Sequence, residues 1–177
     1  MKIPIEIHSI KNPNGTSQFK AIVPLEYAIK DSSINNQLVQ IQNEYSNIIK
    51  NCKSQIQHIQ SKMKSRANPI LKWNLADAIY LFLKSLEKRE LLLANIAEAL
   101  SRDLELSRRE IDSLIKFRTN YPNITLINKD ISWGRYRELL DLPNNTLRKK
   151  FIEKIIKGDL KTRDDIRKYK KELIKNS

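Results

Sequence analysis

The feature that most constrains this chain is a long stretch without proline or glycine, from Ile34 to Arg66. Apolar residues recur along its first half at alternating spacings of four and three, at Ile34, Leu38, Ile41, Tyr45, Ile48 and Cys52. The spacing then slips by one residue through Ile56, Ile59 and Met63. A seam of this kind with a stutter predicts one long, coiled-coil-like α-helix.

The narrow apolar stripe of this helix suits contact with one other helix better than insertion into a globular core. The first interpretation is a homodimer that forms through residues 34–66. The alternative is a partner helix from the same chain. The pattern leaves both open, because a stripe of this width can meet either partner.

Two short strands are expected before this helix, within residues 2–29. KIPIEIHSI alternates isoleucines with polar residues, QFKAIVPL follows it, and Asn14-Gly15 between them is a strong hairpin-turn signal. Pro4 and Pro24 lack amide donors, so we expect these strands to lie at an edge or to end early. Because a lone hairpin is marginal in water, it must pack on another part of the chain.

Glycine and proline are scarce throughout, with 3 and 6 in the whole chain, and apolar residues keep helical spacing after residue 68. We therefore predict a mainly α protein in three parts. These are a β-hairpin over residues 1–30, the long helix over 31–68, and a helical bundle with a helix-turn-helix-like element over 69–177. Trp73 lies on the broad apolar face of the bundle's first helix, which indicates a core position.

The helix-turn-helix-like element comprises two short amphipathic helices in NIAEALSRDLELSRREIDSLIKF. Ser107 and Glu110 form a capping box at the start of the second helix. Basic residues follow on that helix, where a recognition helix meets bases or phosphates: Arg108, Arg109, Lys116 and Arg118. The connection SRDLEL is longer than the tight turn of this motif and has no glycine.

The aromatic residues of ISWGRYRELL follow helical spacing. Trp133 and Tyr136 share one side of a helix begun by Asp130, which predicts that both belong to the core. Arg135 is left on the outer side and Arg137 on a flank, where both are available to phosphate.

The net charge of +13 is unevenly distributed. Residues 131–177 hold fourteen Lys and Arg against seven Asp and Glu, whereas residues 67–130 hold ten against nine. Two helices near the C-terminus carry most of the surplus, and their exposed cations are expected at Arg148, Lys149, Lys150, Lys154, Arg163, Arg167, Lys168 and Lys171. A cationic surface of this kind can bind along a phosphate backbone, so we expect nucleic acid as the partner. Double-stranded DNA is the first candidate.

Asn145 or Thr146 is expected to cap the first of these two helices, and Gly158 to end it. The box Thr162-x-x-Asp165 is expected to begin the second.

Other classes of protein are disfavoured. The longest apolar runs, IYLFL and LLLA, are far shorter than the roughly 20 residues that span a bilayer, and Glu6 and His8 interrupt any signal peptide. Cys52 is the single cysteine and the two histidines are far apart, so we expect no disulfide, no metal site and no cofactor. A cytoplasmic protein that is not an enzyme fits these absences and the lack of a P-loop or nucleophile elbow.

Three segments, SRREIDSLIKFRTNYP, ISWGRYRELL and LRKKFIEKIIKGDLKTRDDIRKYKKEL, resemble the N-terminal helical domain of YhcG-type nucleases. The resemblance covers roughly residues 73–173, and its most specific piece is Ile131-Ser132-Trp133-x-x-Tyr136-x-x-Leu139-Leu140. The sequence departs from the family where Gly134-Arg135 replaces Ser-His and where Leu160-Lys161-Thr162-Arg163 replaces a Trp-containing helix start.

This resemblance implies a targeting or assembly domain without the PD-D/E-x-K nuclease that follows it in the family. Asp159-Leu160-Lys161 spells D-x-K, but it falls in a turn between helices, with no strands to hold a second carboxylate beside it. More loosely, the segment is similar to the helical DNA-binding core of ParB-like partition proteins.

We therefore expect a non-enzymatic, dimeric DNA-binding protein that acts in DNA targeting, regulation or mobile-element maintenance. The alternative is an adaptor subunit that recruits a separately encoded nuclease or another protein partner.

Overall fold

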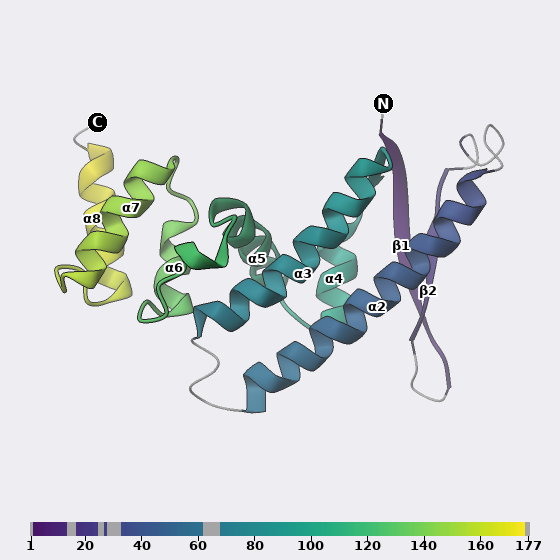
Figure 1. Ribbon diagram of the computed structural model, residues 1–177, viewed down its shortest axis with the longest axis horizontal. Helices are drawn as coiled ribbons and strands as arrows, with labels where there is room; N and C mark the ends of the chain where they lie inside the picture. The colour runs from purple at the N-terminus through teal and green to yellow at the C-terminus, as the bar shows by residue number, and fades with distance from the viewer. Residues whose placement is uncertain (1, 14–16, 25–26, 28–32, 62–67, 176–177) are drawn as a thin grey trace.

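The computed structural model describes residues 2–13, 17–24, 27, 33–61 and 68–175. It confirms a mainly α fold, because seven α-helices and one three-stranded sheet make up most of the regular structure of these residues. The sheet and the C-terminal helices lie at opposite ends of the molecule (Figure 1). No helix in the described part of the chain is long and apolar enough to cross a membrane.

The sheet contains the predicted hairpin and one further strand. β1 (Ile3–Lys11) pairs antiparallel with β2 (Ser17–Ile22), while the turn signal Asn14-Gly15 lies outside the described residues. β3 (Leu91–Leu93), which the sequence pattern does not predict, pairs in parallel with the start of β1 and gives the order β2-β1-β3. The hairpin is thus joined to the helical region through β3.

Helix α2 (Ser33–Ser61) is the predicted long helix, and α3 (Pro69–Lys88) runs beside it in the opposite direction (Figure 1). The seam of α2 faces α3, α4 and β2, and the seam residues Ile41, Tyr45 and Cys52 have no exposed surface. Burial raises the pKa of the Cys52 thiol to about 12, so this thiol stays protonated.

The chain's own elements therefore cover this seam. The homodimer through residues 34–66 stays a prediction. The alternative, an intrachain partner, is what the structure contains. Heptad spacing indicates that a narrow stripe of the helix is buried, but it does not indicate whether the same chain or a second chain covers that stripe. Met63, the last predicted seam residue, lies outside the described residues.

Helices α4 (Ile96–Leu104) and α5 (Arg108–Asn120) pack against each other and are joined by three residues, 105–107. The connection is shorter than SRDLEL because α4 continues through SRDL before it ends. Glu105, the residue that follows α4, then adopts the left-handed conformation with φ of 56°. Glycine is common at this position after a helix. A tight turn without glycine is therefore present.

Three further helices complete the chain: α6 (Trp133–Leu139), α7 (Asn145–Ile156) and α8 (Arg163–Lys175). A single 3-10 turn, Ile124–Leu126, lies between α5 and α6.

Two of the predicted helix starts need correction. α6 begins after Ser132 and not at Asp130. Asn144 caps α7 in place of Asn145 or Thr146, and its side chain accepts a hydrogen bond from the amide of Leu147 at 2.9 Å.

The other two boundaries are as predicted. Thr162 and Asp165 exchange hydrogen bonds of 3.1 and 2.8 Å at the start of α8, and Gly158 follows the end of α7 with φ of 83°.

Aromatic side chains form the core beneath α6. Phe117 lies against Tyr121, Trp133 and Tyr136 with ring centroids 4.9 to 5.3 Å apart. The Trp73 indole donates a hydrogen bond of 2.8 Å to the carbonyl of Tyr121. Both tryptophans are buried, which confirms the prediction that they are core residues.

A buried polar contact links α2 to α4. The Tyr45 hydroxyl donates to the Asp103 carboxylate at 2.9 Å, and Arg102 holds the same carboxylate with two further hydrogen bonds. Burial raises the pKa of Tyr45 well above its ordinary value, and the charge of Asp103 raises it further, so the hydroxyl remains a donor. Asp103 is therefore paired although it is almost fully buried.

We predict that Asp103→Ala lowers the free energy of unfolding by about 2–3 kcal/mol, because it leaves a buried hydroxyl without an acceptor. Urea denaturation followed by circular dichroism measures this change. Asp130→Ala, at an exposed aspartate, is the control and should stay within about 0.5 kcal/mol of the parent. Equal losses in the two variants would contradict the assignment.

Candidate nucleic-acid interface

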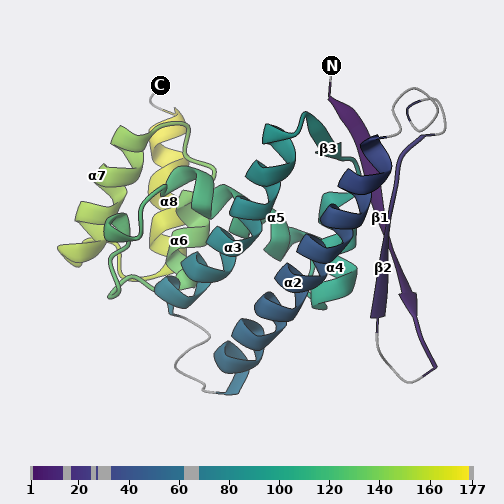
Figure 2. The ribbon, with the colours of Figure 1, turned by 45° about the vertical axis from the view of Figure 1, so that its right-hand side comes forward.

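Five of the predicted site residues converge on one groove. The groove has a volume of about 360 Å³ and lies where α5, α6 and α8 meet; Figure 2 shows α6 beside α8 and near α5. Its cationic lining residues are Arg109, Lys116, Arg137, Arg163 and Arg167. Side chains up to 58 positions apart in sequence, from Arg109 to Arg167, therefore share one site. We call it the α5 groove.

Helix α5 supplies one wall of the α5 groove with its exposed face. Arg109, Asp112, Ser113 and Lys116 lie on this face and line the groove. The opposite face, which includes Leu114, is buried against α3 and α4. This division follows from helical spacing, since residues three, four and seven positions apart share a face. Asp112 and Ser113 are site residues that the spacing from Arg109 could have identified.

Glu110 positions α5 against its neighbours. The Ser107 side chain accepts from the amide of Glu110, as the predicted capping box requires. The Glu110 carboxylate does not return to Ser107. It accepts from Lys72 at 2.7 Å and from the Trp133 indole at 3.1 Å, and lies 3.7 Å from Arg137. One largely buried carboxylate thus joins α3, α5 and α6.

Glu138 holds α8 onto α6. Its carboxylate accepts from Arg163 at 2.6 Å and from Arg167 at 2.8 Å, while its backbone carbonyl accepts from Lys170 at 2.8 Å. Burial acts to raise the pKa of Glu138, but the hydrogen bonds from Arg167 and Arg163 outweigh it, so the net pKa is lowered. The carboxylate is therefore charged at neutral pH.

Lys116 and Asp141 form an exposed ion pair of 2.7 Å at the rim of the α5 groove. The hydrogen bond between them lowers the pKa of Asp141 and raises that of Lys116. Arg109 makes no ion pair with any residue that the structure describes. Five cations and three acids (Asp112, Glu138 and Asp141) line the groove, which leaves a net charge of +2.

Two predicted site residues, the partly buried Arg118 and the buried Arg148, do not line this groove. Arg118 pairs with Asp77 and stacks over the rings of Trp73 and Tyr80, with centroid distances of 4.9 and 4.5 Å. Arg148, predicted to be exposed, is 8% exposed and donates to the carbonyl of Leu142 at 2.6 Å. The predicted exposure of Arg148 is corrected, because its guanidinium finds acceptors within the chain. The role predicted for Arg118 in binding nucleic acid stays a prediction.

The remaining predicted residues lie outside the groove. Arg108 pairs with Glu98 at 3.3 Å, Arg135 donates to the carbonyl of Lys161, and Lys154 lies over the ring of Tyr169. Four lysines are exposed and make no ion pair within the described ranges: Lys149, Lys150, Lys168 and Lys171. Lys149 and Lys150 belong to α7, and Lys168 and Lys171 belong to α8.

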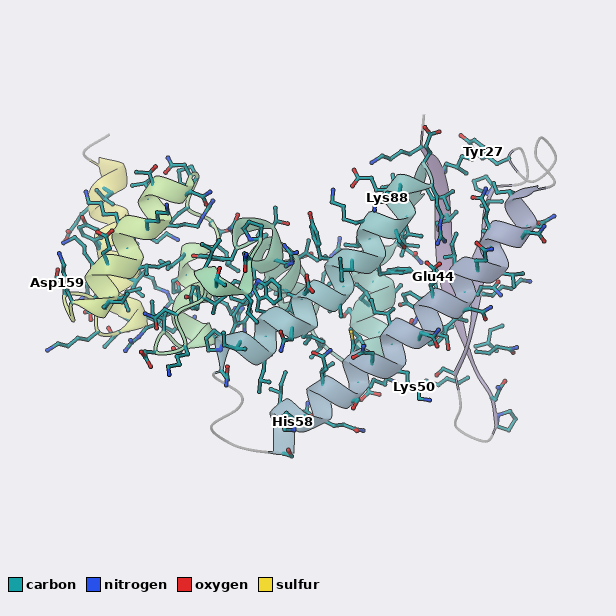
Figure 3. All side chains as sticks on the ribbon, in the orientation of Figure 1. Tyr27, Glu44, Lys50, His58, Lys88 and Asp159 are labelled. Carbon is teal, nitrogen blue, oxygen red and sulfur yellow. The ribbon has the colours of Figure 1, made fainter. Side chains whose placement is uncertain are left out.

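The D-x-K sequence lies in the turn between α7 and α8, at the end of the molecule (Figure 3). Asp159 is exposed and lies 3.6 Å from Lys154. Among the residues that the structure describes, no three His, Cys, Asp or Glu side chains gather into a set that could hold a metal ion.

Comparison with known proteins finds no matching family model, no matching curated protein and no matching solved structure. The resemblance to YhcG-type nucleases therefore stays a prediction from the sequence.

We predict that Glu138→Gln destabilises the fold by about 1–2 kcal/mol at neutral pH, because two charge-assisted pairs become weaker. The folded-state pKa of Glu138 is lowered, so the stabilisation is present above the unfolded pKa of about 4.3 and is lost as pH falls through the folded pKa. Thermal unfolding of both proteins between pH 7 and pH 3 measures this. A difference that stays constant over the range would contradict the prediction.

Proposed function

We propose that this chain is a non-enzymatic nucleic-acid-binding protein whose partner is double-stranded DNA. The α5 groove meets base edges and nearby phosphates, and the exposed lysines of α7 and α8 follow the phosphate backbone. One observation carries the proposal: cationic side chains from three helices converge on the exposed face of α5. Phosphate contacts of this kind supply most of the affinity of such proteins.

The arrangement of α4 and α5 supports a helix-turn-helix-like role. The two helices are joined by three residues, and the second presents Arg109, Asp112, Ser113 and Lys116 on one face. Recognition helices read DNA with residues near their N-terminal end. Arginine pairs with the acceptors of guanine, and aspartate accepts from the amino group of cytosine, so this face has base-reading chemistry.

Arg163 can still donate hydrogen bonds to a phosphate although it pairs with Glu138. Arg163 uses its Nε and Nη2 atoms on Glu138, which leaves the Nη1 donors without a hydrogen bond among the described residues. A guanidinium has five N–H donors, so it can hold a carboxylate and a phosphate together. The ion pair with Glu138 then positions the arginine for a second anion.

The acids of the groove favour a second candidate, an adaptor subunit that recruits a separately encoded protein. Asp112, Glu138 and Asp141 compensate much of the local positive charge, and mixed charge suits a protein surface better than a polyphosphate. Salt separates the candidates, because counterion release makes DNA affinity fall steeply between 50 and 200 mM salt. Absence of duplex binding at low salt would favour the adaptor.

For the lysines, we predict that the double variant Lys149→Ala, Lys150→Ala weakens binding to all duplexes alike. The slope of log affinity against log salt concentration should become shallower by about 2, because two phosphate contacts are lost. Fluorescence anisotropy with labelled duplexes measures both quantities. The matched control removes two exposed lysines from the sheet, Lys11→Ala with Lys20→Ala, and should leave the slope unchanged.

For the α5 face, we predict that Arg109→Ala changes the preference among sequences, with a loss of discrimination of about 1–3 kcal/mol at one base pair. Arg108→Ala is the control, because Arg108 lies outside the groove and pairs with Glu98. Selection from a random duplex library, followed by affinity measurements on single-site variants, tests this. Identical sequence preferences in the two variants would argue against base reading by α5.

A further inference from the structure

Two exposed charged side chains on α5, Arg109 and Asp112, make no hydrogen bond or ion pair with any residue that the structure describes. Both line the α5 groove. The other polar side chains of this wall are engaged within the chain. The Ser113 hydroxyl donates to the backbone carbonyl of Arg109 at 2.7 Å. Lys116 pairs with Asp141 at 2.7 Å. Arg109 and Asp112 therefore keep their hydrogen-bonding groups available to a ligand.

The position of Asp112 gives it no evident task within α5. It is the fifth residue of the helix and lies beyond the first turn, where an acid stabilises the helix dipole and where Glu110 stands. Lys116, four positions later, is the usual partner for an acid on a helix, but its ammonium group binds Asp141. Within the described part of the chain, Asp112 thus supports neither the helix nor its packing.

A free carboxylate is unfavourable on a surface that binds phosphates alone, because like charges repel. The other two acids of the α5 groove are held by cations of the chain, Glu138 by arginines and Asp141 by Lys116. When a duplex covers the exposed face of α5, Asp112 loses water and needs a hydrogen-bond donor. Duplex DNA offers such donors at base edges and not on its phosphates, so Asp112 would face the bases.

The chemistry of the carboxylate selects among the bases. An ionised carboxylate only accepts hydrogen bonds. In the major groove, guanine and thymine present acceptors, which repel it. Adenine presents its N6 amino group beside the N7 acceptor, whereas cytosine presents its N4 amino group without an acceptor beside it on the same base. Cytosine is therefore the base that suits Asp112.

The spacing of the two side chains fits neighbouring base pairs. Arg109 and Asp112 are three positions apart, which corresponds to about 4.5 Å along the helix axis. Successive base pairs of B-DNA are about 3.4 Å apart. On the recognition helices of zinc fingers, residues at this spacing contact successive bases. Arginine suits guanine, because its fork of donors matches the N7 and O6 acceptors.

We propose that α5 reads two neighbouring base pairs of duplex DNA, with Arg109 on a guanine and Asp112 on a cytosine. This inference rests on the proposed function, because it requires a duplex in the α5 groove. It adds that Asp112 determines specificity. On a duplex without cytosine at this position, the carboxylate finds no donor and repels the DNA, so the acid acts chiefly against wrong sequences.

Selection from a random duplex library, run in parallel on the parent, Asp112→Asn and Asp112→Ala, tests the proposal. The parent should select a cytosine next to a guanine. Asp112→Asn should change that cytosine to adenine, because an amide can bond both N6 and N7 of adenine. Fluorescence anisotropy on two duplexes that differ only at this pair should show that their relative affinity changes by about tenfold.

Asp112→Ala is the matched variant, because it removes the same charge without supplying an amide. It should bind the two duplexes alike. Asp130→Asn is the control outside the α5 groove, because it removes another exposed carboxylate, and it should keep the preference of the parent. Circular dichroism establishes that each variant is folded. If Asp112→Asn does not fold, loss of the cytosine preference in Asp112→Ala decides the outcome.

The possible failures are distinguishable. If the parent binds no duplex at low salt, the proposed function fails and this inference fails with it. If the parent binds duplexes but Asp112→Asn keeps its preference, or behaves as Asp112→Ala does, Asp112 does not read a base. In that case the inference is overturned, while DNA binding by the α5 groove stands.

Discussion

Helix α3 is packed on two sides, against α2 on one and α5 on the other, and the position of the α5 groove depends on this double contact. Apolar side chains such as Leu75 and Ile79 supply the burial, and polar contacts orient the helices. The Trp73 indole reaches the end of α5, and Lys72 reaches Glu110 near its start. Because the two contacts lie at opposite ends of α5, they resist rotation as well as separation of the helices.

The same packing relates the α5 groove to the face between α2 and α3. Asp77 lines the groove of about 540 Å³ between α2 and α3 and pairs with Arg118, which belongs to α5. Arg118 in turn lies over the rings of Trp73 and Tyr80, which both belong to α3.

The structure assigns two different tasks to the basic side chains. Arginines of the C-terminal region mostly serve the fold: Arg148 satisfies a loop carbonyl, and Arg163 and Arg167 attach α8 to α6 through Glu138. Lysines such as Lys149 and Lys150 stay in solvent without an ion pair in the described part of the chain. This division follows from chemistry, because the planar guanidinium suits bidentate contacts and the ammonium group is strongly hydrated.

Local patterns in the sequence determined the helices, their buried sides and the uneven charge. Tyr45, Trp73 and Trp133 are core residues because helical spacing places them on apolar faces, which depends only on near neighbours. Tertiary structure alone decided what each buried face meets. The seam of α2 packs inside its own chain, three leucines become β3 because the edge of β1 offers hydrogen bonds, and Arg118 is withdrawn from solvent by an aspartate 41 positions away. Periodicity records that a side chain is covered, whereas its partner depends on contacts between segments far apart in the chain.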